Sequence, residues 1–518
     1  MDPWSWICEL PESHDFSESD THAVFQLGGD LTRSIQLRVE RDSSSDLESL
    51  SLTFKVMAEG FSHLKSSAIW VSNTCVLSSE KPFLPLVLQL LQELISYSPT
   101  TDESTCTKSE LLKIKPGPVN WVMDSHSPES FSSVFNLILI TRLFWLCVFD
   151  APSEVGSFFF QHLLGSQVES LTCQHAPVLR TFLVSVGVDA ELCIVRAASY
   201  VISKWMISKE VGLGNLGLKQ ITSPLPHQSF GFSYATEAHG LWSLKGYFPI
   251  LSMNLANNNK IIKFRIVEPK EAVLRYALSH QHAEVIVQFE YSVTFHENYI
   301  KVNARVDNIR IHVSNLGFNK RRGMENQIAD CYTEEKYFPS RVQVWVGPEI
   351  GSNHVSALSL GWSTKNEERE IEVMRVLKGK FWKGKGKVAP RVKARARMST
   401  RRKIKDWRTE QESEGNAAVF DAVLYDRESG QEVMTVKPSQ EGLKNVFTKS
   451  RGMVFGRDEY GDGAEWRVGR EMEGSVLKWR MGGKIWLTYW PNKLCTSFYE
   501  TRCVEWCDEV DLPLVPTT

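Results

Sequence analysis

The chain has 518 residues, of which 42% are hydrophobic and 23% charged, and its formal net charge is -2. This composition is typical of folded globular proteins and excludes a largely disordered chain or a multi-span membrane protein. Because one core rarely organises more than about 300 residues, we expect two domains.

The first 222 residues predict a mainly α-helical domain. A short strand pair is expected first, at Ala23–Leu27 and Ser34–Val39. Apolar residues with helical spacing then predict four helices. They lie at Ser51–Lys65, Val87–Ile95, Pro152–Leu163 and Cys193–Met206, the last with Asp189 as its N-cap and Gly187 as the stop of the preceding helix.

One apolar stretch, Val134–Phe149, invites comparison with a membrane span. A spanning helix needs roughly twenty largely uncharged residues, and this stretch is shorter and is interrupted by Arg142. We therefore expect a helix buried within the protein, in which Arg142 has a partner or a route to the surface.

Residues 223–518 predict an antiparallel β-rich domain, either a sandwich or an open barrel, so the expected fold class is α+β. Apolar residues occupy alternate positions through Ala283–Phe295, and the alternation of the next strand slips at Asp307–Asn308, where we expect a bulge. The other expected strands are Ile262–Ile266 and Val342–Val346 in the same sheet, a hairpin of Ala418–Tyr425 with Glu432–Val436, and a hairpin of Ser475–Met481 with Lys484–Trp490 across Gly482–Gly483.

Charge is concentrated in one segment. Arg375–Arg408 contains fifteen Lys or Arg and one acid, so it carries +14 and leaves -16 on the rest of the chain. Cations alternate there with small or apolar residues, and a period of two places them on one face of a strand. The predicted binding residues are Lys378, Lys380, Lys383, Lys385, Lys387, Arg391, Lys393, Arg395, Arg397, Arg401, Arg402 and Lys403.

This pattern predicts a non-enzymatic binding or scaffold protein whose cationic face contacts an acidic membrane surface, a nucleic acid or an acidic protein. Other interpretations remain open: a solvated strand edge, pairing with acids of the same chain, or a nuclear import signal at Arg401–Lys405. Ser399 and Thr400 are candidate regulatory phosphosites, because phosphorylation would add negative charge inside the segment.

No catalytic residue, cofactor or metal site is predicted. Gly212–Gly217 matches GxGxxG, but a helix rather than a strand is expected before it. The alternative function is a sugar-binding module or an enzyme with its site among the aromatic and histidine residues of the β-rich domain, since the chain has sixteen Trp. Irregularly spaced cysteines and the lack of a signal peptide at Met1–Trp6 predict a cytoplasmic or nuclear protein, peripheral to a membrane if it binds lipid.

Several stretches between residues 220 and 510 resemble a family of land-plant proteins with no assigned function. The resemblance rests on Leu358–Thr364, Glu368–Glu370, Lys393–Arg401, Trp407 and Glu414–Phe420. It implies a plant origin and transfers no catalytic or binding residue to this chain.

Overall fold

The computed structural model describes residues 2–10, 22–42, 50–61, 64–101, 112–164, 177–211, 231–250, 281–317, 336–361, 369–381, 392–404, 407–425, 431–434, 452–456, 463–490 and 501–516. Strands make up 51% and helices 31% of the structure, so the protein is mostly β. The predicted α+β class is therefore wrong, and the predicted order of a helical N-terminal region before a β-rich C-terminal region is only partly matched. The predicted strand Ile262–Ile266 and the GxGxxG stretch lie outside the described residues.

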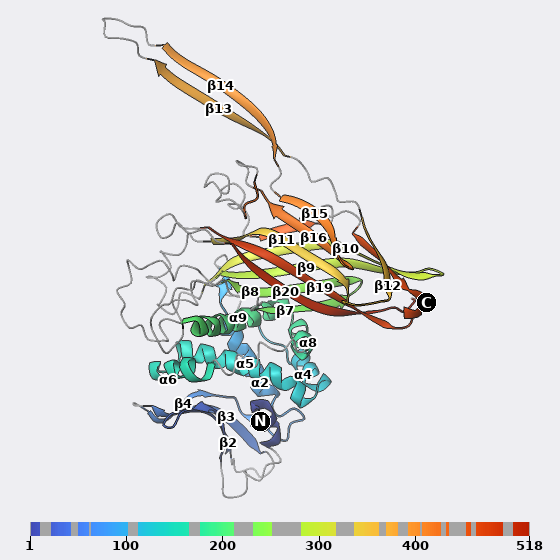
Figure 1. Cartoon of the computed structure of the whole chain (residues 1–518). Coiled ribbons are helices and arrows are strands. Elements are labelled where there is room, and N and C mark those ends of the chain that lie inside the picture. Colours follow the sequence, from blue (N-terminus) through green and yellow to red (C-terminus); the bar gives the residue numbers. More distant parts are fainter. Residues whose placement is uncertain are drawn as a thin grey trace, which may run out of the picture.

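The N-terminal part begins with helix α1, Pro3–Glu9, and a five-stranded antiparallel sheet (Figure 1). The strands β1 to β4 pair in chain order and β5 pairs with β3. Their bounds are β1 His22–Gly29, β2 Ser34–Asp42, β3 Ser51–Phe61, β4 Leu64–Val71 and β5 Cys75–Val76. The predicted strand pair is confirmed as β1 and β2, whereas the helix predicted at Ser51–Lys65 is replaced by β3 and the start of β4.

The failed helix prediction has a local cause. Leu52, Phe54, Val56 and Ala58 are buried at alternate positions of β3, although Phe54 and Phe61 also fit a helical stripe. The segment therefore satisfies both periods. Pairing with β2 along Ser51–Glu59 decides in favour of a strand, because tertiary pairing outweighs local propensity.

Helices form a layer between this sheet and the C-terminal strands (Figure 1). Gly187, with φ at 90°, separates the last two helices as predicted, since this left-handed conformation favours glycine. Asp189 lies in the first turn of the last helix and is not its N-cap. The helices are α1 Pro3–Glu9, α2 Leu84–Tyr97, α4 Pro116–Ser125, α5 Pro128–Phe149, α6 Ser153–Phe158 with a π-helical turn at Phe159–Leu163, α8 Pro177–Ser185 and α9 Val188–Val211.

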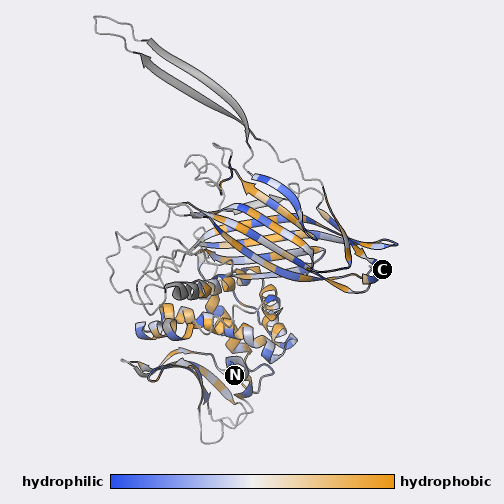
Figure 2. Cartoon of the chain, in the orientation of Figure 1, coloured by the Kyte–Doolittle hydropathy of each residue, from blue (hydrophilic) through white to orange (hydrophobic). Residues whose placement is uncertain are grey.

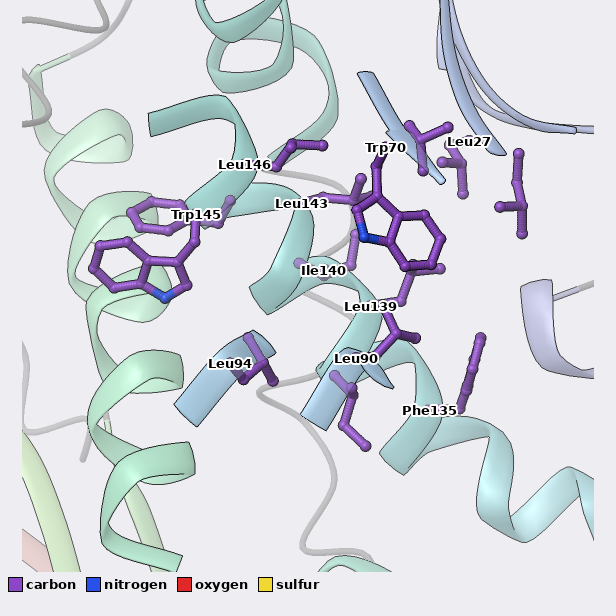
Figure 3. Packing of buried hydrophobic residues seen from close by; sticks show 14 of the residues in the cluster. Leu27, Trp70, Leu90, Leu94, Phe135, Leu139, Ile140, Leu143, Trp145 and Leu146 are labelled. Atoms are coloured by element: carbon purple, nitrogen blue, oxygen red, sulfur yellow. The ribbon is translucent and has the colours of Figure 1, made fainter. Parts of the chain in front are cut away.

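Helix α5 is the centre of the helical layer. By length and composition it is apolar enough to cross a membrane, but 83% of its most apolar stretch is buried inside the protein. Figure 3 shows Leu139 and Leu143 beside Trp70 of β4, while Trp145 points to the other side of the helix. The prediction of a protein-buried helix is confirmed.

Arg142 is the one charged residue in the apolar part of α5, and it is only 5% exposed. Its guanidinium forms an ion pair with Glu93 of α2 and lies 4.8 Å from the ring centroid of Tyr97. Glu93 also accepts a hydrogen bond of 2.8 Å from the indole of Trp70. One carboxylate therefore links α2, α5 and the N-terminal sheet.

The C-terminal strands form two antiparallel sheets that pack face to face. The eight-stranded sheet has the order β12-β18-β10-β9-β8-β7, with β17 and β6 also paired to β10, and the five-stranded sheet has the order β15-β16-β11-β19-β20. The bounds are β6 Thr100–Thr101, β7 Phe232–Ala238, β8 Leu241–Ile250, β9 Gln281–Phe295, β10 Tyr299–Gly317, β11 Lys336–Pro348, β12 Val355–Leu360, β15 Trp407–Glu414, β16 Ala417–Leu424, β17 Gly452–Gly456, β18 Ala464–Gly469, β19 Val476–Trp490 and β20 Thr501–Pro513.

The core of this sandwich comes from alternate residues of both sheets, as the alternating colours along the strands show (Figure 2). Trp479 of the five-stranded sheet lies 5.3 Å from Trp242 and 4.8 Å from Trp466 of the other sheet, measured between ring centroids. All three indoles are fully buried. The prediction of a β-rich region is confirmed at this level.

Two strand predictions need comment. The bulge at Asp307–Asn308 is confirmed, because the pairing of β10 with β9 shifts between Val306 and Asn308. Val342–Val346 forms a strand, β11, but this strand belongs to the sheet opposite β9 and β10. The alternation of a strand gives its buried face and does not identify its neighbours.

Of the two predicted C-terminal hairpins, the one of Ser475–Met481 with Lys484–Trp490 is wrong. β19 runs straight through Gly482–Gly483. A Cβ at Gly482 would lie 2.1 Å from Trp345 and one at Gly483 would lie 2.5 Å from Trp506, so the packing of these indoles requires glycine at both positions. These glycines admit indoles and do not form a turn. The hairpin of Ala418–Tyr425 with Glu432–Val436 is partly confirmed, because Tyr425 and Glu432 form an antiparallel bridge and the Val433 amide donates to the Leu424 carbonyl at 3.0 Å. Residues 435 and 436 lie outside the described residues, and the other partners of this strand are β15 and β11.

We predict that Glu93→Gln destabilises the protein by about 3 kcal/mol, because it leaves the buried Arg142 charge without its counter-ion. The double variant Glu93→Gln/Arg142→Met should recover most of this loss, since it removes the charge as well. Urea unfolding followed by the helical circular dichroism signal measures the difference.

The control for this prediction is Asp124→Asn, which breaks the ion pair with Lys81. Both side chains are about one third exposed or more, at 42% and 34%. Loss of an exposed pair should cost less than about 1 kcal/mol. Equal losses for the two single variants would contradict the structural role of Glu93.

Candidate functional site

The basic segment forms a separate two-stranded antiparallel ribbon, drawn at the top of Figure 1. Its strands are β13, Arg369–Phe381, and β14, Val392–Ile404. They pair without a register shift from Arg369 opposite Ile404 to Phe381 opposite Val392. The register therefore assigns every position of the ribbon to one of two faces.

One face of the ribbon, here called the cationic face, contains most of the basic positions. Odd positions of β14 share this face with even positions of β13. Its basic residues are Lys378, Lys380, Lys393, Arg395, Arg397, Arg401 and Lys403.

Like charges stand directly opposite one another in the outer half of the cationic face. Lys378 is in register with Arg395, and Lys380 with Lys393. Like charges opposite each other destabilise a strand pair. The outer half of the ribbon therefore concentrates positive charge at a cost to its own stability.

The inner half is more balanced. Glu372 is in register with Arg401 and Glu370 with Lys403. Opposite charges at facing positions stabilise a strand pair. Among the positions paired within the ribbon, contact with acids of the same chain, one of the open interpretations of the sequence, is thus favoured at this end.

The remaining predicted binding residues are divided. The register places Arg402 on the opposite face, because it is an even position of β14 facing Ile371. Ser399 falls on the cationic face and Thr400 on the opposite one. Lys383, Lys385, Lys387 and Arg391 lie outside the described residues.

The tryptophans whose side chains the structure describes form no sugar-stacking surface. Trp242, Trp466, Trp479 and Trp506 are fully buried in the sandwich core. Among the tryptophans with a described side chain, only Trp121 of α4 is more than half exposed, at 54%. Sugar stacking needs an accessible ring, so no described residue favours this alternative.

A second polar cluster, which the sequence did not reveal, lies between α9 and the outer face of the eight-stranded sheet. Glu191 of α9 is 1% exposed. It accepts hydrogen bonds from the hydroxyls of Tyr234 on β7 and Tyr247 on β8, and its carboxylate lies 3.0 Å from Nζ of Lys245. Three donors thus compensate the burial of one carboxylate.

The cluster continues on β9. Nε of Arg196 donates to Glu284 at 2.7 Å, and the Glu284 carboxylate lies 3.9 Å from both His282 and His312. Burial is the main influence that lowers the pKa of His282, to about 4. For Glu284, burial acts to raise the pKa, but the contacts with His312 and Arg196 outweigh it and lower the pKa to about 2.

We call these residues the polar seam: Glu191, Arg196, Tyr234, Lys245, Tyr247, His282, Glu284 and His312. The alternation along β9 places His282 and Glu284 on the side opposite its apolar row, yet His282 is only 1% exposed. The sequence contains one sign of this burial, because Ile286 is an apolar residue on the otherwise polar side of β9. An apolar residue there indicates that a second layer covers this face. In the described part of the chain no three His, Cys, Asp or Glu side chains are grouped to hold a metal ion.

Comparison with known proteins adds no argument about function. No family model and no curated protein matches the chain. Among solved structures it is similar to the Clostridium perfringens NetB toxin in its membrane-inserted form, with 11% identity and a TM-score of 0.17, over 54% of this chain and 92% of that one. It is also similar to the C. perfringens delta-toxin, with 8% identity, a TM-score of 0.20 and coverage of 54% and 96%. A third structure, described as a pore forming protein, has 11% identity, a TM-score of 0.17 and coverage of 54% and 95%.

We predict that the polar seam makes stability fall on mild acidification. An unfolded His takes up a proton near pH 6.5, whereas His282 in the folded chain does so near pH 4, so folding loses stability as pH falls between these values. Glu284 adds a further loss between about pH 4.5 and 2. From pH 7 to 5, we expect His282→Gln to remove about 2 kcal/mol of the wild-type loss, measured by urea unfolding at each pH.

His354→Gln is the control, because the His354 side chain is 48% exposed. This variant should keep the wild-type slope of stability against pH. If His282→Gln keeps that slope too, the buried histidine is not the source of acid sensitivity.

Proposed function

We propose that this protein is a non-enzymatic binding protein that attaches to an anionic partner through the cationic face of β13 and β14. The observation that carries the proposal is the register, which sets Lys378 against Arg395 and Lys380 against Lys393. Facing cations cost stability in the free ribbon. An anionic partner would relieve that repulsion, and the relief would add to the free energy of binding.

The charge distribution of the whole chain supports local attachment. The segment Arg375–Arg408 carries +14 within a chain of net charge -2. Exposed charges farther apart than about 8 Å are largely screened at physiological ionic strength. An anionic partner would therefore be attracted by the local positive charge of the ribbon. The acidic remainder of the chain would repel it and limit non-specific contact elsewhere.

Ser399 would be the regulatory position of this function. It falls between Arg397 and Arg401 on the cationic face, whereas Thr400 falls on the other face. A phosphate there would add about -1.5 to -2 charges among the cations and weaken binding. The cytoplasm and the nucleus, where anionic leaflets and nucleic acids are accessible, are the compartments in which the proposal places the protein.

The test is a triple variant, Lys393→Gln/Arg395→Gln/Arg397→Gln. Each cation near an anionic surface contributes about 1 kcal/mol, so we expect retention on duplex DNA and on phosphatidylserine vesicles at low salt to fall about 100-fold. Binding is measured by co-sedimentation with vesicles and by fluorescence anisotropy with labelled DNA.

The matched control is Arg369→Gln/Arg375→Gln/Arg402→Gln, which removes the same charge from the opposite face of the same ribbon. It should keep binding within about tenfold of the wild type. If both triple variants bind both probes as the wild type does, the ribbon is not the attachment site. If both lose binding equally, net charge and not the cationic face is responsible.

A further inference from the structure

The opposite face of the ribbon, here called the apolar face, has a different composition. It comprises the odd positions of β13 and the even positions of β14. In the outer half of the ribbon these positions hold mainly apolar or small residues. They are Val373, Leu377, Gly379 and Phe381 of β13, and Val392, Ala394, Ala396 and Met398 of β14, with Arg375 and Thr400 as the polar exceptions.

A two-stranded ribbon has no second layer of its own to cover an apolar face. In the described part of the chain neither β13 nor β14 pairs with any other strand. Isolated two-stranded hairpins are at best marginally stable in water, and they gain stability when an apolar face packs against something. The ribbon would therefore be stabilised by an apolar layer packed against one face and an anionic group bound to the other.

From this amphipathic register we infer that the anionic partner is a lipid bilayer, with the outer half of the ribbon lying in the interface. The inference rests on the proposed function and specifies its partner. A bilayer surface combines negative charge with an apolar layer a few ångströms deeper, and both faces of the ribbon are then used.

The dimensions fit this placement. Interfacial amphipathic segments bury their apolar side about 5–10 Å into the boundary between headgroups and acyl chains. A strand is thin enough that its other face then lies at the depth of the phosphates, and long Lys and Arg side chains extend to such depths readily. The inner half, with Glu370 and Glu372 on one face and Arg369 and Arg402 on the other, is suited to water.

A nucleic-acid partner would explain the composition of only one face of the ribbon. Phosphate contacts would use the cationic face, and base stacking relies on aromatic rings. Phe381 is the only aromatic residue in the two strands. A row of Val, Leu, Ala and Met residues at alternate positions has no corresponding role on DNA or RNA.

The experiment separates the two faces by salt. Electrostatic attachment should disappear near about 0.5 M NaCl, where screening lengths are only a few ångströms, whereas acyl contact should persist. We expect the full chain to keep part of its binding at this salt on vesicles with about 30% phosphatidylserine and to lose binding to duplex DNA. The variant Val373→Ser/Met398→Ser, which alters only the apolar face, should lower salt-resistant vesicle binding about tenfold.

A control of identical composition is Val376→Ser/Met374→Ser, because neither residue is on the apolar face. It should keep the salt-resistant part of vesicle binding, and thermal unfolding of each variant checks that the fold is intact. If both serine variants bind vesicles equally at high salt, or if the wild type has no salt-resistant binding, the bilayer inference is overturned.

These outcomes are independent of the proposed function. The Lys393/Arg395/Arg397 variant could lose binding while Val373→Ser/Met398→Ser has no effect. This result would support attachment through the cationic face and contradict the inference that the partner is a bilayer. Tighter wild-type binding to duplex DNA than to vesicles at every salt would likewise identify a nucleic acid as the partner.

Discussion

The alternation of side chains along a β-strand is the constraint on which this molecule depends. In the sandwich it directs residues such as Trp242 and Trp479 into one shared core. In the ribbon of β13 and β14 the same alternation, together with an unbroken register, separates Lys378 and Arg395 from Leu377 and Ala396. One geometric rule thus generates the stable body and the proposed binding surface, and it does so from two very different compositions.

The two cores of the protein are joined by polar contacts. The helical layer and the N-terminal sheet share one hydrophobic core, and the sandwich has another. Between them lie the polar seam and an ion pair of 2.9 Å from Arg180 of α8 to Asp508 of β20. Polar interfaces of this kind are typical of domains that associate without fusing into one core. The buried Glu191 and His282 make this junction the acid-sensitive part of the molecule.

The sequence predicted those features for which one physical signal dominates. Helix α5 was recognisable because its apolar stretch contains Arg142, which a membrane would not accommodate, and the bulge in β10 was recognisable from a slip in alternation. Segment Ser51–Phe61 was not recognisable as a strand, because its apolar residues fit both the helical and the strand period. Only its pairing with β2 favours the strand. Gly482–Gly483 resembled a turn until the indoles of Trp345 and Trp506 explained it. The cationic face was visible in the alternation of β14, but the register with β13, which sets Lys378 against Arg395 and Leu377 against Ala396, could be read only from the structure.

The connection between the ribbon and the sandwich gives the molecule an orientation. Only Lys405 and Asp406 separate the end of β14 from the start of β15. Three peptide units span at most about 11 Å, so the inner end of the ribbon stays close to the β15 edge of the five-stranded sheet. The N-terminal sheet is at the far end of the molecule (Figure 1). Attachment through the outer half of the ribbon would therefore be vectorial, with the β15 corner on the side of the molecule that faces the partner and the N-terminal sheet on the side that faces away.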